Sequence, residues 1–204
     1  MTSMSEFIID DDTIMSPYTR EVAEYCDPFC YDDEELDSFF AQQVFLYQEE
    51  LLCRAYCWIN KNNDKEIVAI ATFSYDGIKS YTLDNSSRNS LQRKIPYKKH
   101  HRSYPAMLIG RLGVSQNYQG KGLNVGSQLM QTLKVLCANE NGMGICRYLL
   151  VDAYNTDATL HYYAKNGFKP LYKTEQSERE VFDIPEKESL KSRIMYFDLK
   201  LVKA

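Results

Sequence analysis

The sequence predicts an α/β (α+β) fold in which a mixed, mostly antiparallel sheet is flanked by helices. Two observations lead to this prediction: the first half holds a helical pattern followed by a hairpin, and the second half alternates strand, helix, strand, helix and strand. The chain has 204 residues, 44% hydrophobic and 25% charged, which is enough to bury a core without disulfides or metals. We therefore expect a single domain over residues 1–204.

The first predicted helix follows an acidic leader, residues 1–30. Asp32 and Asp33 can cap its start, and its first turn is rich in carboxylates, which suit the positive end of a helix. Its apolar residues recur at helical spacing, so one face packs on a core. Strands over residues 54–60 and 66–75 follow, joined by a polar turn, and predict a hairpin.

The second half begins with a polar, basic stretch, residues 76–105, which we expect to form a long loop or a short helix with an excursion. A polar linker, residues 176–192, precedes the last strand. Gly167 is expected to end the second helix of this half. The predicted strands cover residues 106–114, 147–153, 168–172 and 193–202, and the predicted helices cover residues 125–137 and 156–166.

Charge is distributed unevenly along the chain. Residues 1–50 carry 14 acids and one base, whereas residues 85–139 carry nine bases and no acid. An acid-free segment of this length is a candidate surface for a polyanion such as a phosphorylated cofactor or RNA. The alternative is that both segments are solvated faces whose charges cancel in space.

Apolar runs and cysteines exclude several classes of protein. The start has neither the basic flank nor the apolar run of a signal peptide, and no segment approaches the roughly 18 apolar residues of a membrane span. We therefore expect a cytoplasmic protein with no membrane partner. Cys26/Cys30 and Cys53/Cys57 repeat a four-residue spacing, but no histidine lies nearby, so we expect reduced, packed thiols and no metal site.

A glycine-rich turn, residues 119–127, lies between an apolar strand and a helix. Glycines leave backbone N–H groups unobstructed where the helix begins, so these groups and the positive helix end can hold an anion. A Walker loop does not fit, because Ser115 replaces its first glycine and Gly122 stands where Ser or Thr must hold magnesium. Two alternatives remain open: a dinucleotide fold using Gly120, Gly122 and Gly126, and a turn that binds nothing.

Two motifs in order resemble the GNAT N-acetyltransferase family. Gln119-Gly120-Lys121-Gly122 is similar to motif A of that family, Q/R-x-x-G-x-G/A, whose backbone amides hold the pyrophosphate of acetyl-CoA. The strand at residues 151–155 and the helix end at residues 163–168, Tyr-Ala-Lys-Asn-Gly-Phe, resemble the family's second landmark, Y-x-K-x-G-F. The resemblance covers residues 106–172 and implies the GNAT fold, with a splay between the two central strands.

The resemblance also implies an activity and a set of site residues. The protein would be an acetyltransferase (an acyltransferase) that uses acetyl-CoA as co-substrate and a primary amine as acceptor. Tyr163 would be catalytic, as the acid that protonates the leaving thiolate. A turn or capping role suits Asn155 as well as a contact with pantetheine. The cofactor-binding residues implied are Leu112, Gly113 and Val114 at the acetyl carbonyl, Gln119, Gly120, Lys121, Gly122, Asn124, Gly126 and Ser127 in the turn, and Asn155.

The chain departs from the family pattern at two points. Asn124 stands where the family has its last Gly or Ala, and a small residue returns only at Gly126. Many members carry a glutamate general base on the strand before motif A, yet no carboxylate occurs between Asp84 and Glu140. A low-pKa α-amine then suits the enzyme better than a lysine side chain, which at pH 7 is deprotonated in about one molecule in 2,500, against roughly one in ten for an α-amine.

Three hypotheses about acceptor and partner follow. The first expectation is a small-molecule or peptide α-amine. The second is aminoacyl-tRNA, because residues 108–119 are similar to the GNAT toxins of bacterial toxin-antitoxin pairs, and the basic run Arg93 to Arg102, with Tyr97 and Tyr104, could grip RNA. The third is a non-catalytic module that binds acetyl-CoA or a protein. The sequence leaves open whether the protein forms a homodimer or has an antitoxin.

Overall fold

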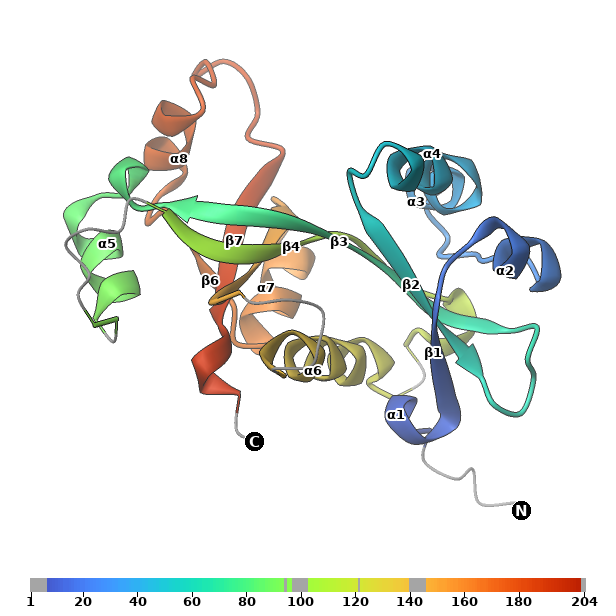
Figure 1. The fold of residues 1–204 in the computed structure, drawn as a ribbon. Helices are drawn as coiled ribbons and strands as arrows, with labels where there is room; N and C mark the ends of the chain where they lie inside the picture. The colour runs from blue at the N-terminus through green and yellow to red at the C-terminus, as the bar shows by residue number, and fades with distance from the viewer. Residues whose placement is uncertain (1–6, 94, 97–102, 121, 140–145, 203–204) are drawn as a thin grey trace. The chain divides into compact units, whose positions relative to one another are not determined.

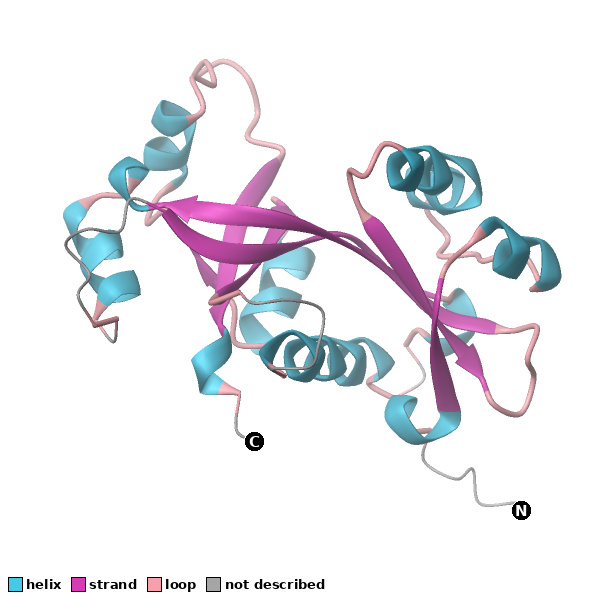
Figure 2. Cartoon of the chain, in the orientation of Figure 1, coloured by secondary structure: helices cyan, strands magenta, loops and turns pink. Residues whose placement is uncertain are grey.

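The structure is a computed structural model that describes residues 7–93, 95–96, 103–120, 122–139 and 146–202. Its strands form one seven-stranded mixed sheet of order β1-β2-β3-β4-β5-β7-β6, in which β4 and β5 are parallel, with helices flanking it (Figures 1 and 2). This confirms the predicted α+β class. The strands are β1 (Thr13–Pro17), β2 (Arg54–Asn60), β3 (Ile67–Lys79), β4 (Ser103–Val114), β5 (Tyr148–Tyr154), β6 (Lys169–Pro170) and β7 (Ser192–Asp198).

Most helices are short. Those up to β3 are α1 (Ile9–Asp12), α2 (Arg20–Tyr25), α3 (Glu34–Ser38), the π-helical η1 (Phe39–Gln43) and α4 (Val44–Glu49). Those after β3 are the 3₁₀ turn η2 (Ser80–Thr82), α5 (Asn85–Gln92), the 3₁₀ turn η4 (Gln116–Tyr118), α6 (Val125–Ala138), α7 (Asp157–Lys165), α8 (Glu175–Val181) and the 3₁₀ turn η5 (Leu199–Leu201).

The predicted helix after Asp33 is confirmed, with an internal irregularity. The Asp33 carboxylate accepts a hydrogen bond from the backbone N–H of Leu36 at 2.9 Å, as its capping role predicts. The five residues of η1 then follow a π-helical path between α3 and α4. The helix ends with Leu51 at φ +58°, and the N–H of Leu52 donates to the carbonyl of Tyr47 at 2.8 Å. This C-terminal turn usually takes glycine at the left-handed position.

The acidic leader and the polar linker both hold elements that the sequence did not predict. Residues 1–30 contain α1, β1 and α2, and β1 pairs antiparallel with β2 from Thr13 opposite Asn60 to Pro17 opposite Tyr56. Most of α8 falls within residues 176–192, capped by Thr174. Polarity misled the prediction, because short capped elements with few buried residues carry no clear apolar period.

Two predicted strands were too long. For residues 76–105, where the sequence predicted either a long loop or a short helix, the structure gives an answer. The strand expected over residues 193–202 ends at Asp198, whose side chain accepts from the N–H of Lys200 at 3.0 Å and starts η5. The strand expected over residues 168–172 covers only β6, where Pro170 has no N–H to extend the pairing. In residues 76–105, the described part forms the end of β3, η2, α5 and the start of β4.

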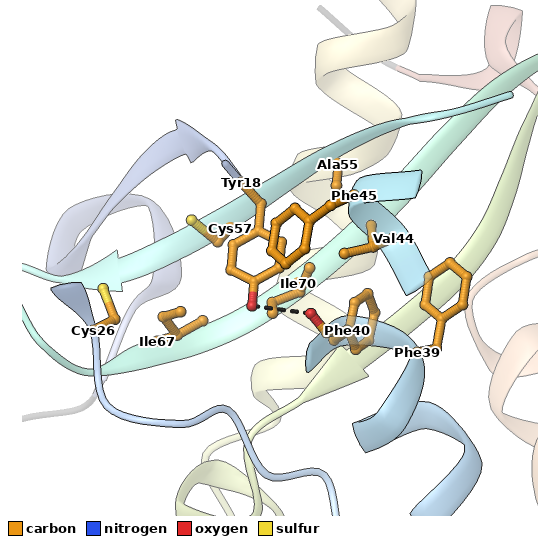
Figure 3. Close-up of a cluster of buried hydrophobic side chains, with 10 residues drawn as sticks. All are labelled: Tyr18, Cys26, Phe39, Phe40, Val44, Phe45, Ala55, Cys57, Ile67 and Ile70. Carbon is orange, nitrogen blue, oxygen red and sulfur yellow. Dashed lines mark hydrogen bonds between the residues drawn. The ribbon is translucent and has the colours of Figure 1, made fainter. Parts of the chain in front are cut away.

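The chain divides into two compact units, Met1–Ser74 with Ile109–Leu133, and Tyr75–Leu108 with Lys134–Ala204. A cluster of ten buried residues lies in the core of the first unit, where the hydroxyl of Tyr18 donates to the carbonyl of Phe40 at 3.2 Å (Figure 3). Cys26 and Cys57 lie in this core, and burial raises the pKa of the Cys57 thiol to about 12. All six cysteines are free. The expectation of a single domain stays a prediction.

The second unit has its own core, formed around β5 and β7. These strands pair antiparallel from Tyr148 opposite Asp198 to Tyr154 opposite Ser192. One cluster of buried residues in this core comprises Ile78, Leu83, Leu91, Tyr104, Ala106, Tyr148, Leu150, Leu171 and Tyr172.

A buried ion pair fastens α8 to β7 in this unit. Glu178 is 2% exposed, and its carboxylate accepts from Nε of Arg193 at 2.5 Å and from the N–H of Ile194 at 2.6 Å. Arg193 also donates to the carbonyl of Tyr172 at 3.0 Å. Burial raises the pKa of Glu178, against the hydrogen bonds of Ile194 and Arg193, which lower it. The carboxylate therefore depends on these donors to remain charged.

We predict that Arg193→Met lowers the free energy of unfolding by about 3 kcal/mol at pH 8, because it leaves a buried carboxylate without its counter-ion. A carboxyl whose pKa is raised in the folded state contributes most to the free energy of unfolding below its ordinary pKa. That contribution is lost as the pH rises through the raised value. The loss should therefore be smaller at pH 5 than at pH 8 in urea unfolding. Lys191→Met, an exposed cation nearby, is the control. An equal loss at both pH values would contradict the prediction.

Candidate functional site

The end of β4 packs directly beneath aromatic rings. A Cβ added to Gly113 would lie 3.1 Å from Cζ of Phe29 and 3.3 Å from Cε2 of Phe40. Gly113 and Val114 are buried, and Leu112 is half-buried. The backbone of β4 therefore approaches these rings more closely than a side chain at Gly113 would comfortably allow.

After β4 the chain is pinned to two neighbouring segments of the same unit. The N–H of Ser115 donates to the carbonyl of Val68 in β3 at 2.8 Å, and the N–H of Gln116 donates to the carbonyl of Cys30 at 2.9 Å. These bonds fix the position of η4, which directly precedes the glycine turn.

Gln119 closes the base of the turn with its side chain. Its Nε2 donates to the carbonyl of Val114 at 2.7 Å and to the carbonyl of Tyr31 at 3.0 Å. Both hydrogens of the amide are thus used on the protein's own backbone. A side-chain contact between Gln119 and a ligand could use only its oxygen.

The glycines of the turn have conformations that L side chains rarely adopt. Gly120 has φ +68° and Gly122 has φ +73°, and nothing lies within 4 Å of a Cβ built on either. Asn124 also lies in the left-handed region, at φ +52°. Asparagine tolerates this conformation better than most residues, so it can stand where the family pattern has a glycine. Lys121 lies outside the described residues.

The turn leads into α6, a helix of 14 residues. The carbonyl of Asn124 accepts from the N–H groups of Ser127 at 2.9 Å and Gln128 at 3.0 Å, so the helix starts directly after the turn. Gly126 and Ser127 lie in this first turn, which contains no acidic residue. The positive helix end and the open space over the two glycines together fit a diphosphate.

Tyr163 and Asn155 belong to the second unit. Tyr163 is half-buried on α7, and its ring centroid lies 5.5 Å from that of Phe168 and 5.1 Å from that of Tyr162. Gly167, at φ +80°, ends the helix as predicted, and the N–H of Phe168 donates to the carbonyl of Tyr163 at 3.0 Å.

The side chain of Asn155 is used within its own unit. Its Nδ2 donates to the Glu175 carboxylate at 3.1 Å and to the carbonyl of Leu190 at 3.0 Å, and its N–H donates to the carbonyl of Lys191 at 2.9 Å. These contacts fit the predicted turn role, and the contact with pantetheine stays a prediction.

Residues 18–168 match the model of the acetyltransferase (GNAT) family. The chain belongs to this family. Members of the family use acetyl-CoA. The sequence matches no curated protein.

Three solved structures, of the two proteins AtaT and KacT, share the fold at low sequence identity. AtaT complexed with acetyl-methionyl-tRNAfMet has TM-score 0.61 and 18% identity, over 93% of this chain and 96% of that chain. A tyrosine-to-phenylalanine mutant of KacT has TM-score 0.59 and 16% identity, over 93% and 96%. A tyrosine-to-phenylalanine mutant of the toxin AtaT, bound to the C-terminus of the antitoxin AtaR and acetyl-CoA, has TM-score 0.56 and 15% identity, over 93% and 95%. At these identities the likeness concerns the fold.

Sequence reasoning missed the side chains that hold the GNAT glycine turn from outside it. Gln128 on α6 and Tyr118 on η4 bond to segments far away in the sequence, Gln128 to residues 7–9 and Tyr118 to Asn60 and Glu66. No local pattern signals such contacts, because the partners lie 52 to 121 positions apart.

Two further expectations concern parts of the chain only partly described. The basic run from Arg93 to Arg102 lies mostly outside the described residues, including Tyr97, Lys98 and Lys99. Within the described residues, no helix is long and apolar enough to cross a membrane, and no group of three or more His, Cys, Asp or Glu side chains is placed to hold a metal ion.

Proposed function

We propose that this protein transfers the acetyl group of acetyl-CoA to an α-amine, and that the acceptor is an aminoacyl-tRNA. The observation that carries the transfer itself is the glycine turn in a chain of the GNAT family: Gly120 and Gly122 are left-handed and unobstructed, and the first turn of the helix that follows has no acidic residue. Gly120, Gly122, Asn124, Gly126 and Ser127 hold the diphosphate through backbone groups, with Lys121 beside them.

The reaction needs little more from the protein than positioning and one proton. The amine attacks the thioester carbonyl carbon, the carbon–sulfur bond breaks, and the thiolate leaves. Backbone amides from Leu112 to Val114 polarise the carbonyl in this proposal. Tyr163 donates its hydroxyl proton to the thiolate, and it regains a proton from solvent, which takes up the proton that the attacking nitrogen loses as the amide forms. With ordinary pKa values of about 10 and 8.5, the transfer is uphill unless the tyrosine is well positioned and reprotonated.

A low-pKa acceptor amine removes the need for a strong general base on the protein. Strand β4 carries no carboxylate, and Glu35, which reaches it from α3, is paired with Arg111 at 3.3 Å. An aminoacyl ester amine has a lower pKa than a free α-amine, so it is available for attack without a strong base. This favours α-amines over lysine side chains and polyamines.

Aminoacyl-tRNA now stands ahead of the small-molecule or peptide α-amine that the sequence favoured. AtaT, similar in fold, has been solved with acetyl-methionyl-tRNAfMet, a product of this chemistry. The nine bases of residues 85–139 offer charge for an RNA backbone. We also propose a protein partner of the antitoxin kind from the likeness in fold, because a mutant of AtaT has been solved bound to the C-terminus of the antitoxin AtaR.

The first prediction tests the turn. Acetyl-CoA should raise the melting temperature of the wild-type protein, since only the native state presents the turn. Gly122→Val should abolish this rise, because a β-branched residue is strained at φ +73° and its carbons enter the space over the backbone. Asparagine tolerates this φ, so Gly122→Asn adds a side chain with little backbone strain. A rise lost in both variants indicates obstruction by the side chain, and a rise lost only in Gly122→Val indicates strain. An unchanged rise in Gly122→Val would remove the turn from the proposal.

The second prediction separates an enzyme from a binding module. Tyr163→Phe should keep acetyl-CoA affinity and lower kcat by about 10² to 10⁴-fold, because only proton donation is lost. Tyr162→Phe, its neighbour on α7, is the matched control and should retain activity. Full activity in Tyr163→Phe would make this tyrosine a packing residue.

The third prediction identifies the acceptor. With charged tRNA the rate should fall steeply with salt, because several phosphates are neutralised, whereas a small α-amine should show a shallow dependence. Replacing Lys98, Lys99 and Arg102 by alanine should slow only the tRNA reaction. The control replaces three cations outside the acid-free segment, Lys65, Lys79 and Lys187. Preferred acetylation of polyamines, insensitive to both sets, would refute the proposed acceptor.

A further inference from the structure

The N-terminal segment, residues 7–12, contacts the chain on both sides of the glycine turn. Before the turn, the ring centroid of Phe7 lies 4.9 Å from that of Tyr118. After the turn, the backbone of Phe7 and Ile9 bonds to Gln128 on α6. We call this segment the N-terminal strap. It lies in the same compact unit as the turn.

Gln128 uses its whole side-chain amide in this arrangement. Its Nε2 donates to the carbonyl of Phe7 at 2.9 Å and to the carbonyl of Leu123 at 2.8 Å, and its Oε1 accepts from the N–H of Ile9 at 2.9 Å. Leu123 is the residue that follows Gly122 in the turn. One side chain thus ties the end of the turn to the strap, with both donors and the acceptor satisfied.

Two further contacts anchor the strap itself. The hydroxyl of Thr132, one helical turn after Gln128, donates to the Asp10 carboxylate at 2.6 Å. The side chain of Ile9 is 1% exposed. The strap is therefore fixed by burial as well as by hydrogen bonds, and it can serve as a support for the turn.

Tyr118 provides the matching anchor before the turn. Its hydroxyl donates to the Glu66 carboxylate at 2.8 Å and accepts from Nδ2 of Asn60 at 2.8 Å, and Asn60 donates to the same carboxylate at 2.9 Å. Burial, with the bond to Glu66, raises the pKa of Tyr118 to about 12, so the hydroxyl stays protonated and remains a donor.

We propose that the N-terminal strap, acting through Gln128 and Tyr118, holds the glycine turn in the conformation that binds the diphosphate of acetyl-CoA. Gln128 and Tyr118 are positioning residues. The inference rests on the proposed function, because it takes this turn as the acetyl-CoA site. Two left-handed glycines in open space are not held by packing of their own, so a turn without support would lose more conformational freedom on binding.

The test compares Gln128→Met with Gln131→Met. Methionine matches the shape of glutamine but offers no amide, and Gln131 is an exposed residue of the same helix. Gln128→Met should raise the Kd and KM for acetyl-CoA about tenfold, the worth of about one net hydrogen bond, and leave kcat at saturating acetyl-CoA unchanged. Gln131→Met should leave all three unchanged. Hydrogen exchange of the turn should be faster in Gln128→Met and slow again when acetyl-CoA saturates it.

A second variant keeps the inference testable if Gln128→Met unfolds. Phe7→Ala removes the ring contact with Tyr118 and keeps the backbone carbonyl that Gln128 binds, and it should weaken acetyl-CoA binding with the same unchanged kcat. If wild-type protein binds acetyl-CoA and both variants bind it within twofold of wild type, the strap has no role in binding and the inference is wrong. If wild-type protein itself does not bind, the proposed function fails instead.

Discussion

The backbone path after β4 is the constraint on which the candidate site depends. The chain leaves a buried strand and starts a helix within a few residues, and it does so with left-handed conformations at Gly120, Gly122 and Asn124. The described residues of the turn do not pair with a neighbouring strand. The side-chain amides of Gln119, at the base of the turn, and Gln128, after it, hold the turn by hydrogen bonds instead. Each bonds to main-chain groups, so side chains that flank the two glycines hold the turn.

Packing at the end of β4 makes Gly113 and Val114 unfavourable positions for a carboxylate. The backbone at Gly113 lies against the rings of Phe29 and Phe40, and Val114 is buried beside it. A glutamate among these apolar groups would have to lose its hydration without a counter-ion nearby, which is costly. The one guanidinium on this part of β4, Arg111, is engaged with Glu35 and lies 5.2 Å from the centre of the Phe39 ring. In the proposed mechanism this end of the strand therefore acts through its backbone amides and not through a side-chain base.

The fold could be predicted where the sequence carries a local signal. Asp33 caps a helix, Gly167 ends one, and the hairpin of β2 and β3 follows from two apolar runs separated by a polar turn. What could not be predicted depends on distant partners. The short β1 is stabilised by pairing with β2, and α8 is stabilised by the ion pair between Glu178 and Arg193. Neither segment is apolar enough to reveal these contacts in advance.

The same distinction applies to the site and to the charge pattern. The glycine motif located the turn, but the roles of Gln119 and Gln128 follow only from where their amides point. Several acids of the first 50 residues likewise have local tasks: Asp37 accepts from the N–H of Tyr31 at 2.6 Å, Asp12 accepts from the N–H of Ile8 at 2.7 Å, and Asp10 binds Thr132. Backbone N–H groups and hydroxyls offset part of such a carboxylate's charge without a cation. An acidic segment over residues 1–50 is therefore compatible with the candidate anion site in the same unit, because several of its acids stabilise the segments that support the turn.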